Sequence, residues 1–223
     1  MNIRSGHHGW RHQTEIQLIA QTLDNAGFDV QMFLAMQDLT LDECIDQAIH
    51  RHSSYPHTQR GMIVAAGGDG TINAVVQHLL HTEIELGILP FGTFNYVARA
   101  LNIPVDVPEA VQNLIDGQTH AIHVGSVNGK IYLNNASIGL YPVIIESREY
   151  YNKKFGRFPL VAYLSGLSTL LRPYHPFKLR LKIDGYKHLI DSPLVFFGNN
   201  QLQLQDLKLR LASCAAQGKL AGV

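Results

Sequence analysis

The chain has 223 residues, of which 46% are hydrophobic, which is enough for a buried core and too many for a disordered protein. Its 18 Lys and Arg residues balance 18 Asp and Glu residues, so no overall charge draws it to nucleic acid. Two cysteines are no disulfide framework and fit a reducing compartment. No apolar run is long enough to span a bilayer, so we expect membrane contact only at the surface.

In the first half of the chain, helical and strand patterns alternate. Apolar residues at helical spacing end at Gly27, a typical C-cap, and residues 28–35 then read as a strand. Thr40 and Glu43 form a capping box that opens a second helix. The further expected elements are, in chain order, a strand over 61–66, a helix over 72–80, a strand over 84–90, a short helix through Leu101 and a helix from Pro108 to Gly117. This alternation predicts a parallel sheet with helices on its faces.

The pattern changes near residue 122, where we place a domain boundary. Asn128-Gly129 and Asp184-Gly185 each stand between alternating runs, which is typical of β-hairpins. Pro159 begins a helical pattern, and residues 192–200 read as one more strand. We therefore expect an α/β domain over 1–122 and a mainly antiparallel β domain over 123–223, with one or two inserted helices.

A loop rich in glycine stands between the strand pattern over 61–66 and the helix after it. Gly67, Gly68 and Gly70 leave backbone N–H groups open to an anion, and the helix amino end adds a positive dipole. Thr71 either caps the helix or donates to a phosphate oxygen. Asp69 holds a cation that accompanies the phosphate, orients the loop through backbone N–H bonds, or accepts a proton. The loop is neither a Walker A motif nor the dinucleotide fingerprint, so a tight turn capped by Asp and Thr stays an alternative.

The stretch GGDGTIN, followed after a helix and a strand by GILPFGTFNYVARALNIP, resembles the diacylglycerol kinase catalytic-domain family of lipid kinases. The resemblance continues in NNASIGL, GRFPLVAYLSGL and PLVFFGNN, covers nearly the whole chain and keeps the family's order. NAD kinases share the GGDGT loop but do not continue with G-T-x-N-x-x-A-R. The second motif therefore favours the lipid kinases.

This resemblance implies an ATP-binding, Rossmann-like α/β domain, a β-sandwich second domain and a site in the cleft between them, with ATP and Mg²⁺ as its ligands. Ser5 and Gly6 match the family's opening loop N-P-x-S-G, with Ile3 where proline is usual. Asn95 supports the loop or the phosphate, or else caps the next helix. The implied nucleotide contacts are Ser5, Gly6, Gly67, Gly68, Asp69, Gly70, Thr71, Ile72, Asn73, Thr93 and Asn95, with Asp69 as the candidate metal ligand.

The implied activity is transfer of the γ-phosphate of ATP to the hydroxyl of a diacylglycerol-like lipid. The implied setting is a cytoplasmic protein that touches the inner face of the membrane transiently and does not bind nucleic acid. No catalytic residue is identified in the chain, because the family's late D-G-E segment, whose aspartate is thought to be the general base, has no match. Gln217 stands where an acidic residue tied to a structural magnesium is expected, and the family's first strand is unmatched.

From these departures we expect the 223-residue chain to be at best a weak kinase, since losing a general base typically costs on the order of 10²–10⁴-fold. Two alternatives stay open: a nucleotide-binding protein without catalysis, and an NAD-kinase-like enzyme with a soluble acceptor. Tyr96 replaces the family's usual Asp or His, and Ala74 replaces a frequent Glu. Diacylglycerol, sphingoid bases and polyprenols therefore all stay open as acceptors. Asn134 and Ser137 either face the cleft or form hydrogen bonds within the sandwich.

Two clusters of polar residues receive a simpler interpretation. Three histidines near the amino terminus lack carboxylate or thiolate neighbours, so we expect a solvated loop rather than a metal site: His7, His8 and His12. A basic stretch before the Pro159 helix is expected to be a solvated face, with attraction of anionic lipid headgroups as the alternative: Arg148, Lys153, Lys154 and Arg157.

Overall fold

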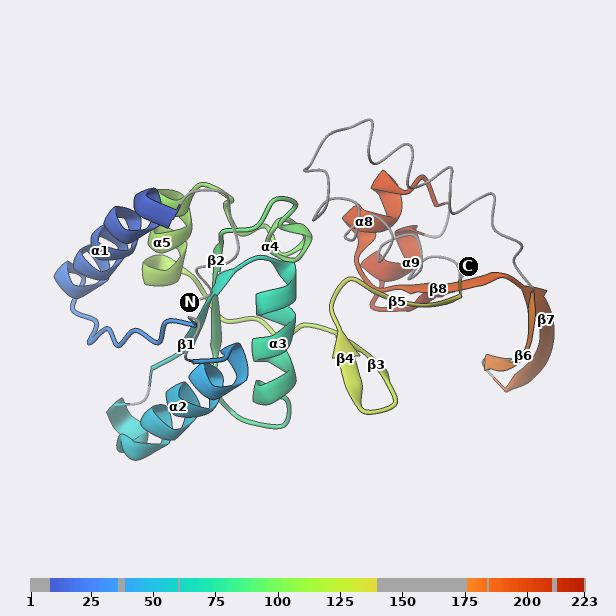
Figure 1. Cartoon of the computed structure of the whole chain (residues 1–223), viewed down its shortest axis with the longest axis horizontal. Coiled ribbons are helices and arrows are strands. Elements are labelled where there is room, and N and C mark those ends of the chain that lie inside the picture. The colour runs from blue at the N-terminus through green and yellow to red at the C-terminus, as the bar shows by residue number, and fades with distance from the viewer. Residues whose placement is uncertain are drawn as a thin grey trace.

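The computed structural model of the chain describes residues 9–35, 39–59, 61–139, 176–183, 185–209 and 212–222. It consists of an α/β part and a part that, in its described residues, combines small antiparallel sheets with the short helices α8 and α9 (Figure 1). The predicted class, a mixed α/β fold with a parallel sheet followed by antiparallel strands, is therefore confirmed. Several predictions lie outside the described residues, namely those for Ser5, Gly6, His7, His8, the side chain of His12, the basic stretch at 148–157 and the Pro159 helix.

In the α/β part, helices cover both faces of a parallel pair of strands. Its elements are α1 (Gly9–Asn25), α2 (Leu41–Ser54), the 3₁₀ turn η1 (His57–Gln59), β1 (Ile63–Gly67), α3 (Asp69–Leu79), β2 (Leu86–Pro90), α4 (Tyr96–Ala100) and α5 (Val107–Asp116). Successive strand residues point to opposite faces. Ala65 and Ile88 pack against α2, α3 and α4, whereas Ala66 and Leu89 pack against α1 and α5.

Local signals fix the helix ends where the sequence predicts them. Gly27 follows α1 with φ of 91°, and the Phe28 N–H donates to the Leu23 carbonyl at 3.1 Å, which satisfies one of the last carbonyls of the helix. The Thr40 hydroxyl accepts from the Glu43 N–H at 3.2 Å, and the Glu43 carboxylate accepts from the Thr40 N–H at 2.8 Å. The predicted capping box of α2 is confirmed.

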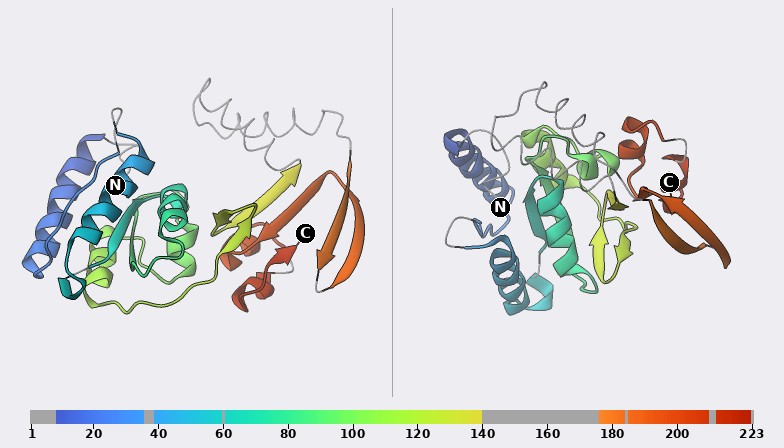
Figure 2. Two further views of the ribbon diagram at one scale, coloured as in Figure 1. Left: turned by 90° about the horizontal axis from the view of Figure 1, so that it is seen from below. Right: turned by 45° about the vertical axis from the view of Figure 1, so that its right-hand side comes forward.

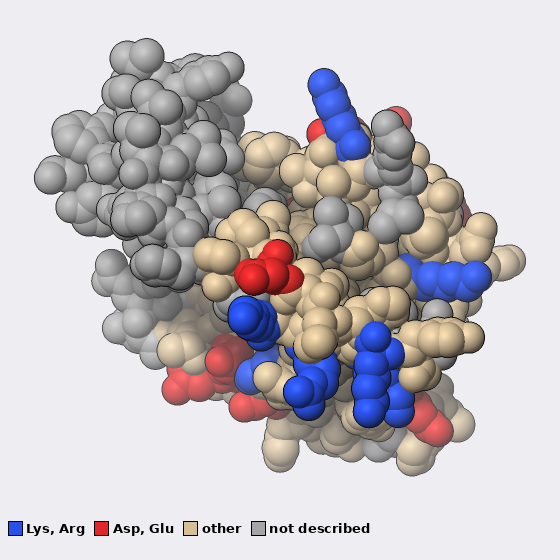
Figure 3. Space-filling view, turned by 90° about the vertical axis from the view of Figure 1, so that its right-hand side faces the viewer, with Lys and Arg blue, Asp and Glu red and all other residues tan. Residues whose placement is uncertain are grey.

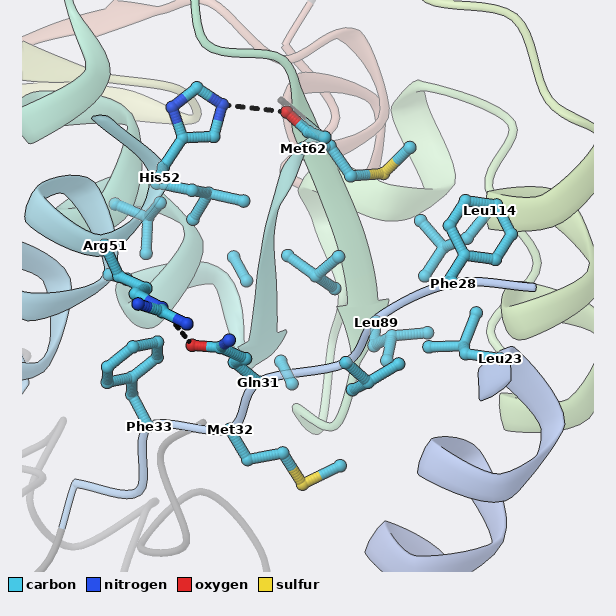
Figure 4. Close-up of a pocket in the computed structure, with 18 of the residues that line it drawn as sticks. Leu23, Phe28, Gln31, Met32, Phe33, Arg51, His52, Met62, Leu89 and Leu114 are labelled. Atoms are coloured by element: carbon cyan, nitrogen blue, oxygen red, sulfur yellow. Dashed lines mark hydrogen bonds between the residues drawn. The ribbon is translucent and has the colours of Figure 1, made fainter. Parts of the chain in front are cut away.

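The strand expected over residues 28–35 is not found. Residues 28–34 belong to no ladder in the described structure, and Ala35 forms only an isolated bridge. An apolar cavity of about 590 Å³ lies between this segment and β1 (Figure 4), and the two form no ladder in the described structure. Side chains hold the segment instead: Arg51 donates to the Gln31 side-chain oxygen at 2.8 Å, and the Tyr55 hydroxyl donates to Asp29 at 3.0 Å.

The described residues of the second part form three small antiparallel sheets. Its elements are β3 (Gly125–Val127), β4 (Lys130–Tyr132), β5 (Asn135–Gly139), β6 (Phe177–Ile183), β7 (Tyr186–Ser192), β8 (Leu194–Gly198), α8 (Gln201–Asp206), α9 (Ala212–Ala216) and β9 (Ala221–Gly222). Both predicted hairpins are confirmed: β3 pairs with β4 across Asn128 and Gly129, with φ of 51° and 76°, and β6 pairs with β7. The third sheet has the order β5-β8-β9.

Helices α8 and α9 follow the expected last strand and were not predicted from the sequence. Asn200 caps α8 by accepting from the Gln203 N–H at 3.2 Å. Residues 117–124, which include the proposed boundary at 122, contain no helix or strand and connect the two parts.

Asn200 also joins the two parts of the molecule. Its buried side chain donates to the Tyr96 carbonyl of α4 and to the Asn134 side chain, both at 2.9 Å. The same side chain therefore caps α8, holds the segment before β5 and contacts the α/β part.

Replacing Asn200 by alanine should lower the free energy of unfolding by about 2 kcal/mol or more, because three hydrogen bonds at part-buried positions are lost. Urea unfolding of N200A measures this loss. Asn113→Ala, at an exposed position of α5, serves as the control and should leave stability within about 0.5 kcal/mol of the native value. Equal stability of the two variants would show that Asn200 does not hold the two parts together.

Candidate functional site

Two loops meet at the carboxyl ends of β1 and β2. The strands are parallel neighbours, with Gly67 opposite Pro90, so the chain leaves both at the same edge of the sheet. The Phe91 N–H extends this pairing by donating to the Gly67 carbonyl at 3.0 Å. Residues 67–71, called here the first loop, therefore lie beside residues 91–95, called the second loop.

The two loops touch through backbone atoms. A Cβ atom built on Gly92 would lie 2.7 Å from the Gly68 Cα atom, and a Cβ atom on Gly68 would lie 3.2 Å from the Gly92 Cα atom. Side chains at these positions would separate the loops, so both must be glycine for the backbones to meet. Gly68 of GGDGT and Gly92 of PFGT are thus favoured by contact with each other, and this preference is independent of any ligand.

Asp69 joins the loops electrostatically. Its carboxylate accepts from the Val97 N–H at 2.8 Å and from the Tyr96 N–H at 3.2 Å. These N–H groups belong to the first turn of α4, which has no carbonyl partners for them. Of the roles considered for Asp69, these bonds match the one in which it orients a loop through backbone N–H groups. The loop that it orients is the second one.

Asn95 shapes the second loop. Its backbone has φ of 50°, a left-handed conformation that asparagine tolerates better than most residues. The buried side chain accepts from the Gly92 N–H at 2.9 Å and donates to the Gly92 carbonyl at 3.0 Å. Asn95 stands at the N-cap position of α4, but its side chain makes no cap bond there, because Asp69 supplies the cap. The Asn95 side chain therefore supports the loop.

The amino end of α3 faces the same region. Gly68 is its N-cap residue and provides no side-chain cap, while the Ile72 N–H donates to the Gly68 carbonyl at 3.1 Å. A Cβ atom on Gly70 would meet no atom within 4 Å, so open space lies beside the first turn. Thr71, by contrast, is buried, and its side chain fills the space next to Gly67. The geometry suits an anion that approaches Gly70.

Two predicted nucleotide contacts point their side chains elsewhere. Ile72 is 0% exposed and belongs to the core, so only its backbone is available to a ligand. The Asn73 side chain accepts from the Leu133 N–H at 3.0 Å and donates to the Ile131 carbonyl at 3.3 Å. Both residues lie inside α3, beyond the first turn, and face neighbouring elements. Thr93 is exposed in the second loop.

Gln77 is a residue that the sequence analysis missed. It lies one turn after Asn73 on α3, and its side chain accepts from the Ile131 N–H at 2.8 Å and donates to the Gly129 carbonyl at 3.3 Å. Together the two amide side chains hold the backbone of β4. Their spacing of four residues on one helix face was the available signal. Asn134 lies at the same junction and accepts from Asn200, while Ser137 lies on β5.

A cavity of about 350 Å³ lies between α4, residues 121–123 and the chain around Asn200. The first and second loops do not line it.

Within the described ranges, no group of three His, Cys, Asp or Glu side chains is arranged to hold a metal ion. No helix in the described part of the chain is long and apolar enough to cross a membrane.

Comparison with known proteins identifies relatives of this arrangement. The family model of the diacylglycerol kinase catalytic domain matches residues 1–127. A diacylglycerol kinase from Bacillus subtilis (strain 168) is 32% identical over 171 residues, covering 75% of this chain and 53% of that protein. A diacylglycerol kinase from Staphylococcus aureus (strain JH9) is 29% identical over 181 residues, covering 79% of this chain and 54% of that protein. The chain thus spans about half the length of the curated relatives it matches.

Solved structures agree on the fold. A diacylglycerol kinase structure from Bacillus anthracis (strain Sterne) superposes with a TM-score of 0.64 at 22% identity, covering 90% of this chain and 62% of that one. A second structure from the same organism gives a TM-score of 0.67 at 24% identity, covering 90% and 63%. At these identities the likeness concerns the arrangement of helices and strands.

The contact between the loops gives a direct test. Gly92→Ala should lower the free energy of unfolding by about 1–3 kcal/mol, because the added methyl group would overlap Gly68 and Asn95. Thermal unfolding of G92A measures the loss. Gly61→Ala is the matched control, because a Cβ atom there meets nothing within 4 Å. A G92A protein as stable as G61A would contradict the close contact between the loops.

Proposed function

Because the chain belongs to the diacylglycerol kinase catalytic-domain family, we propose that its two loops bind the phosphates of ATP as part of a lipid kinase. The reaction is transfer of the γ-phosphate of ATP to the hydroxyl of a diacylglycerol-like lipid. The partners in this proposal are the lipid substrate and, transiently, the inner face of the membrane that contains it, reached from the cytoplasm.

One observation carries the proposal: the first turn of α3 faces open space at Gly70, directly beside the second loop. Helix amino ends attract anions through their N–H groups and their dipole, and a residue without a side chain lets phosphate oxygens approach those groups. Asp69 supports this role indirectly. By bonding to Val97 and Tyr96, it holds the two loops in one fixed arrangement before any ligand arrives.

Mg²⁺ fits this site as a companion of the nucleotide. It usually binds to kinases through substrate phosphates and one or two carboxylates, and it keeps several waters. Asp69 is the carboxylate at the loops, and its oxygens have lone pairs beyond the two that accept N–H groups. When bound, Mg²⁺ would neutralise phosphate charge during transfer. The residues of the chain position the nucleotide, since phosphoryl transfer depends mainly on positioning and charge stabilisation.

A second candidate function is nucleotide binding without transfer. It is favoured by the engagement of Asp69, whose two carboxylate oxygens both accept hydrogen bonds that hold α4. A carboxylate committed in this way is a structural support rather than a base for the lipid hydroxyl. In this alternative, ATP binds at the same loops and no acceptor is phosphorylated.

Gly70→Glu tests the nucleotide site. The Cβ position is open, and an acidic side chain in the first turn of a helix is favourable, so the fold should be retained. Repulsion of the phosphates should weaken ATP binding, measured by calorimetry, by at least about tenfold. Gly61→Glu introduces the same charge into equally open space at the other end of β1 and should leave ATP affinity unchanged. Unaltered affinity of G70E would refute the site.

The acceptor is tested with labelled ATP and four acceptors: diacylglycerol, a sphingoid base, a polyprenol and NAD. We expect label on a lipid and none on NAD, with thin-layer separation as the measurement. Label on NAD alone would contradict the lipid kinase. ATP binding with no labelled product from this chain would favour nucleotide binding without transfer.

A further inference from the structure

The hairpin of β6 and β7 forms a two-stranded sheet of its own at the end of the molecule farthest from α1 (Figures 1 and 2). In its register Lys178 lies opposite Asp191, and Lys182 lies opposite Lys187. Directly opposed residues, and residues two apart on one strand, share a face of the sheet. One face, called here the basic face, therefore consists of Lys178, Arg180, Lys182, Lys187, Leu189 and Asp191.

The basic face concentrates positive charge. It carries four cations and one carboxylate, in a chain that has 18 residues of each sign, and all six of its side chains are exposed. Lys182 and Lys187 are a direct cross-strand pair of like charges, an arrangement that weakens a hairpin. Within the described chain, none of the four cations forms an ion pair. Figure 3 shows Lys and Arg side chains gathered at this end of the molecule.

Exposed apolar groups accompany these cations. Leu189 is 81% exposed and lies opposite Arg180, in the middle of the basic face. Tyr186, which pairs with Ile183 at the turn end of the other face, is 74% exposed. The other face of the hairpin contains Leu179, Leu181 and Ile190, which are partly buried. Leu189 is thus an apolar side chain presented to solvent among cations, whereas Leu179, Leu181 and Ile190 are partly shielded.

We propose that the basic face docks on a bilayer that contains anionic phospholipids. The four cations match the headgroup phosphates, and Leu189 among them matches the boundary between headgroups and acyl chains. A nucleic acid would satisfy the cations but would gain nothing from Leu189, and the chain has no net positive charge to follow a phosphate backbone. The purpose of this docking, bringing the protein to a lipid acceptor, rests on the proposed function, whereas the docking itself requires no ATP.

The test is co-sedimentation of the chain with vesicles of phosphatidylcholine alone and of phosphatidylcholine mixed with phosphatidylglycerol. The native chain should bind the anionic vesicles in preference, and 0.5 M salt should release it. The variant K178Q/K182Q/K187Q should bind about a hundredfold more weakly, at roughly fivefold for each lysine. The matched control K130Q/K208Q/K219Q removes three exposed lysines from other elements and should bind like the native chain. Leu189→Ala, at unchanged charge, should weaken binding several-fold.

The outcomes separate the possibilities. The proposal is overturned if the two triple variants bind equally, if both kinds of vesicle bind equally, or if Leu189→Ala has no effect while a short RNA duplex binds to the same lysines. ATP affinity, measured in each variant, should stay unchanged. Loss of vesicle binding with normal ATP affinity supports the docking face, whereas failure of the native chain to bind ATP refutes only the proposed function.

Discussion

The rest of the site depends on the carboxylate of Asp69, which caps α4 from a neighbouring loop. Hydrogen bonds to a charged acceptor contribute about 1.5–3 kcal/mol each, so the Tyr96 and Val97 N–H groups anchor the second loop firmly to the first. With α4 held there, Val97 and Ala98 fill the core beside α3. The contact between Gly68 and Gly92 then follows, because no side chain intervenes. The two hydrogen bonds of Asp69 at the sheet edge thereby contribute both to the core packing and to the shape of the candidate site.

The features that the sequence predicted well are those governed by neighbouring residues. Gly27, the capping box of Thr40 and Glu43, and the Asn128-Gly129 turn all act within a few positions of the chain, and all are found where expected. The strand over 28–35 fails for the opposite reason. A strand requires a partner, and the alternation of its residues says nothing about whether a backbone lies within reach.

The directions in which side chains point at the site could not be predicted from the sequence either. The motif placed Ile72 and Asn73 with the nucleotide, but three-dimensional packing turns Ile72 into the core and Asn73 toward the backbone of β4. Gln77 lies in no recognised motif and Asn200 ends the PLVFFGNN motif, but neither pattern reveals partners that lie 52 to 104 residues away in the chain. Amides with distant partners can be recognised only once the elements are placed.

The hydrogen bonds of Tyr96 have a mechanical consequence. Its N–H group donates to Asp69 and its carbonyl accepts from Asn200, so one residue connects the glycine loop to the cap of α8. Two hydrogen bonds and one residue thus separate the first loop from the amino end of α8. Any movement of one part against the other would have to break the bond between Tyr96 and Asn200 as well as the bonds from Asn73 and Gln77 to the backbone around β4.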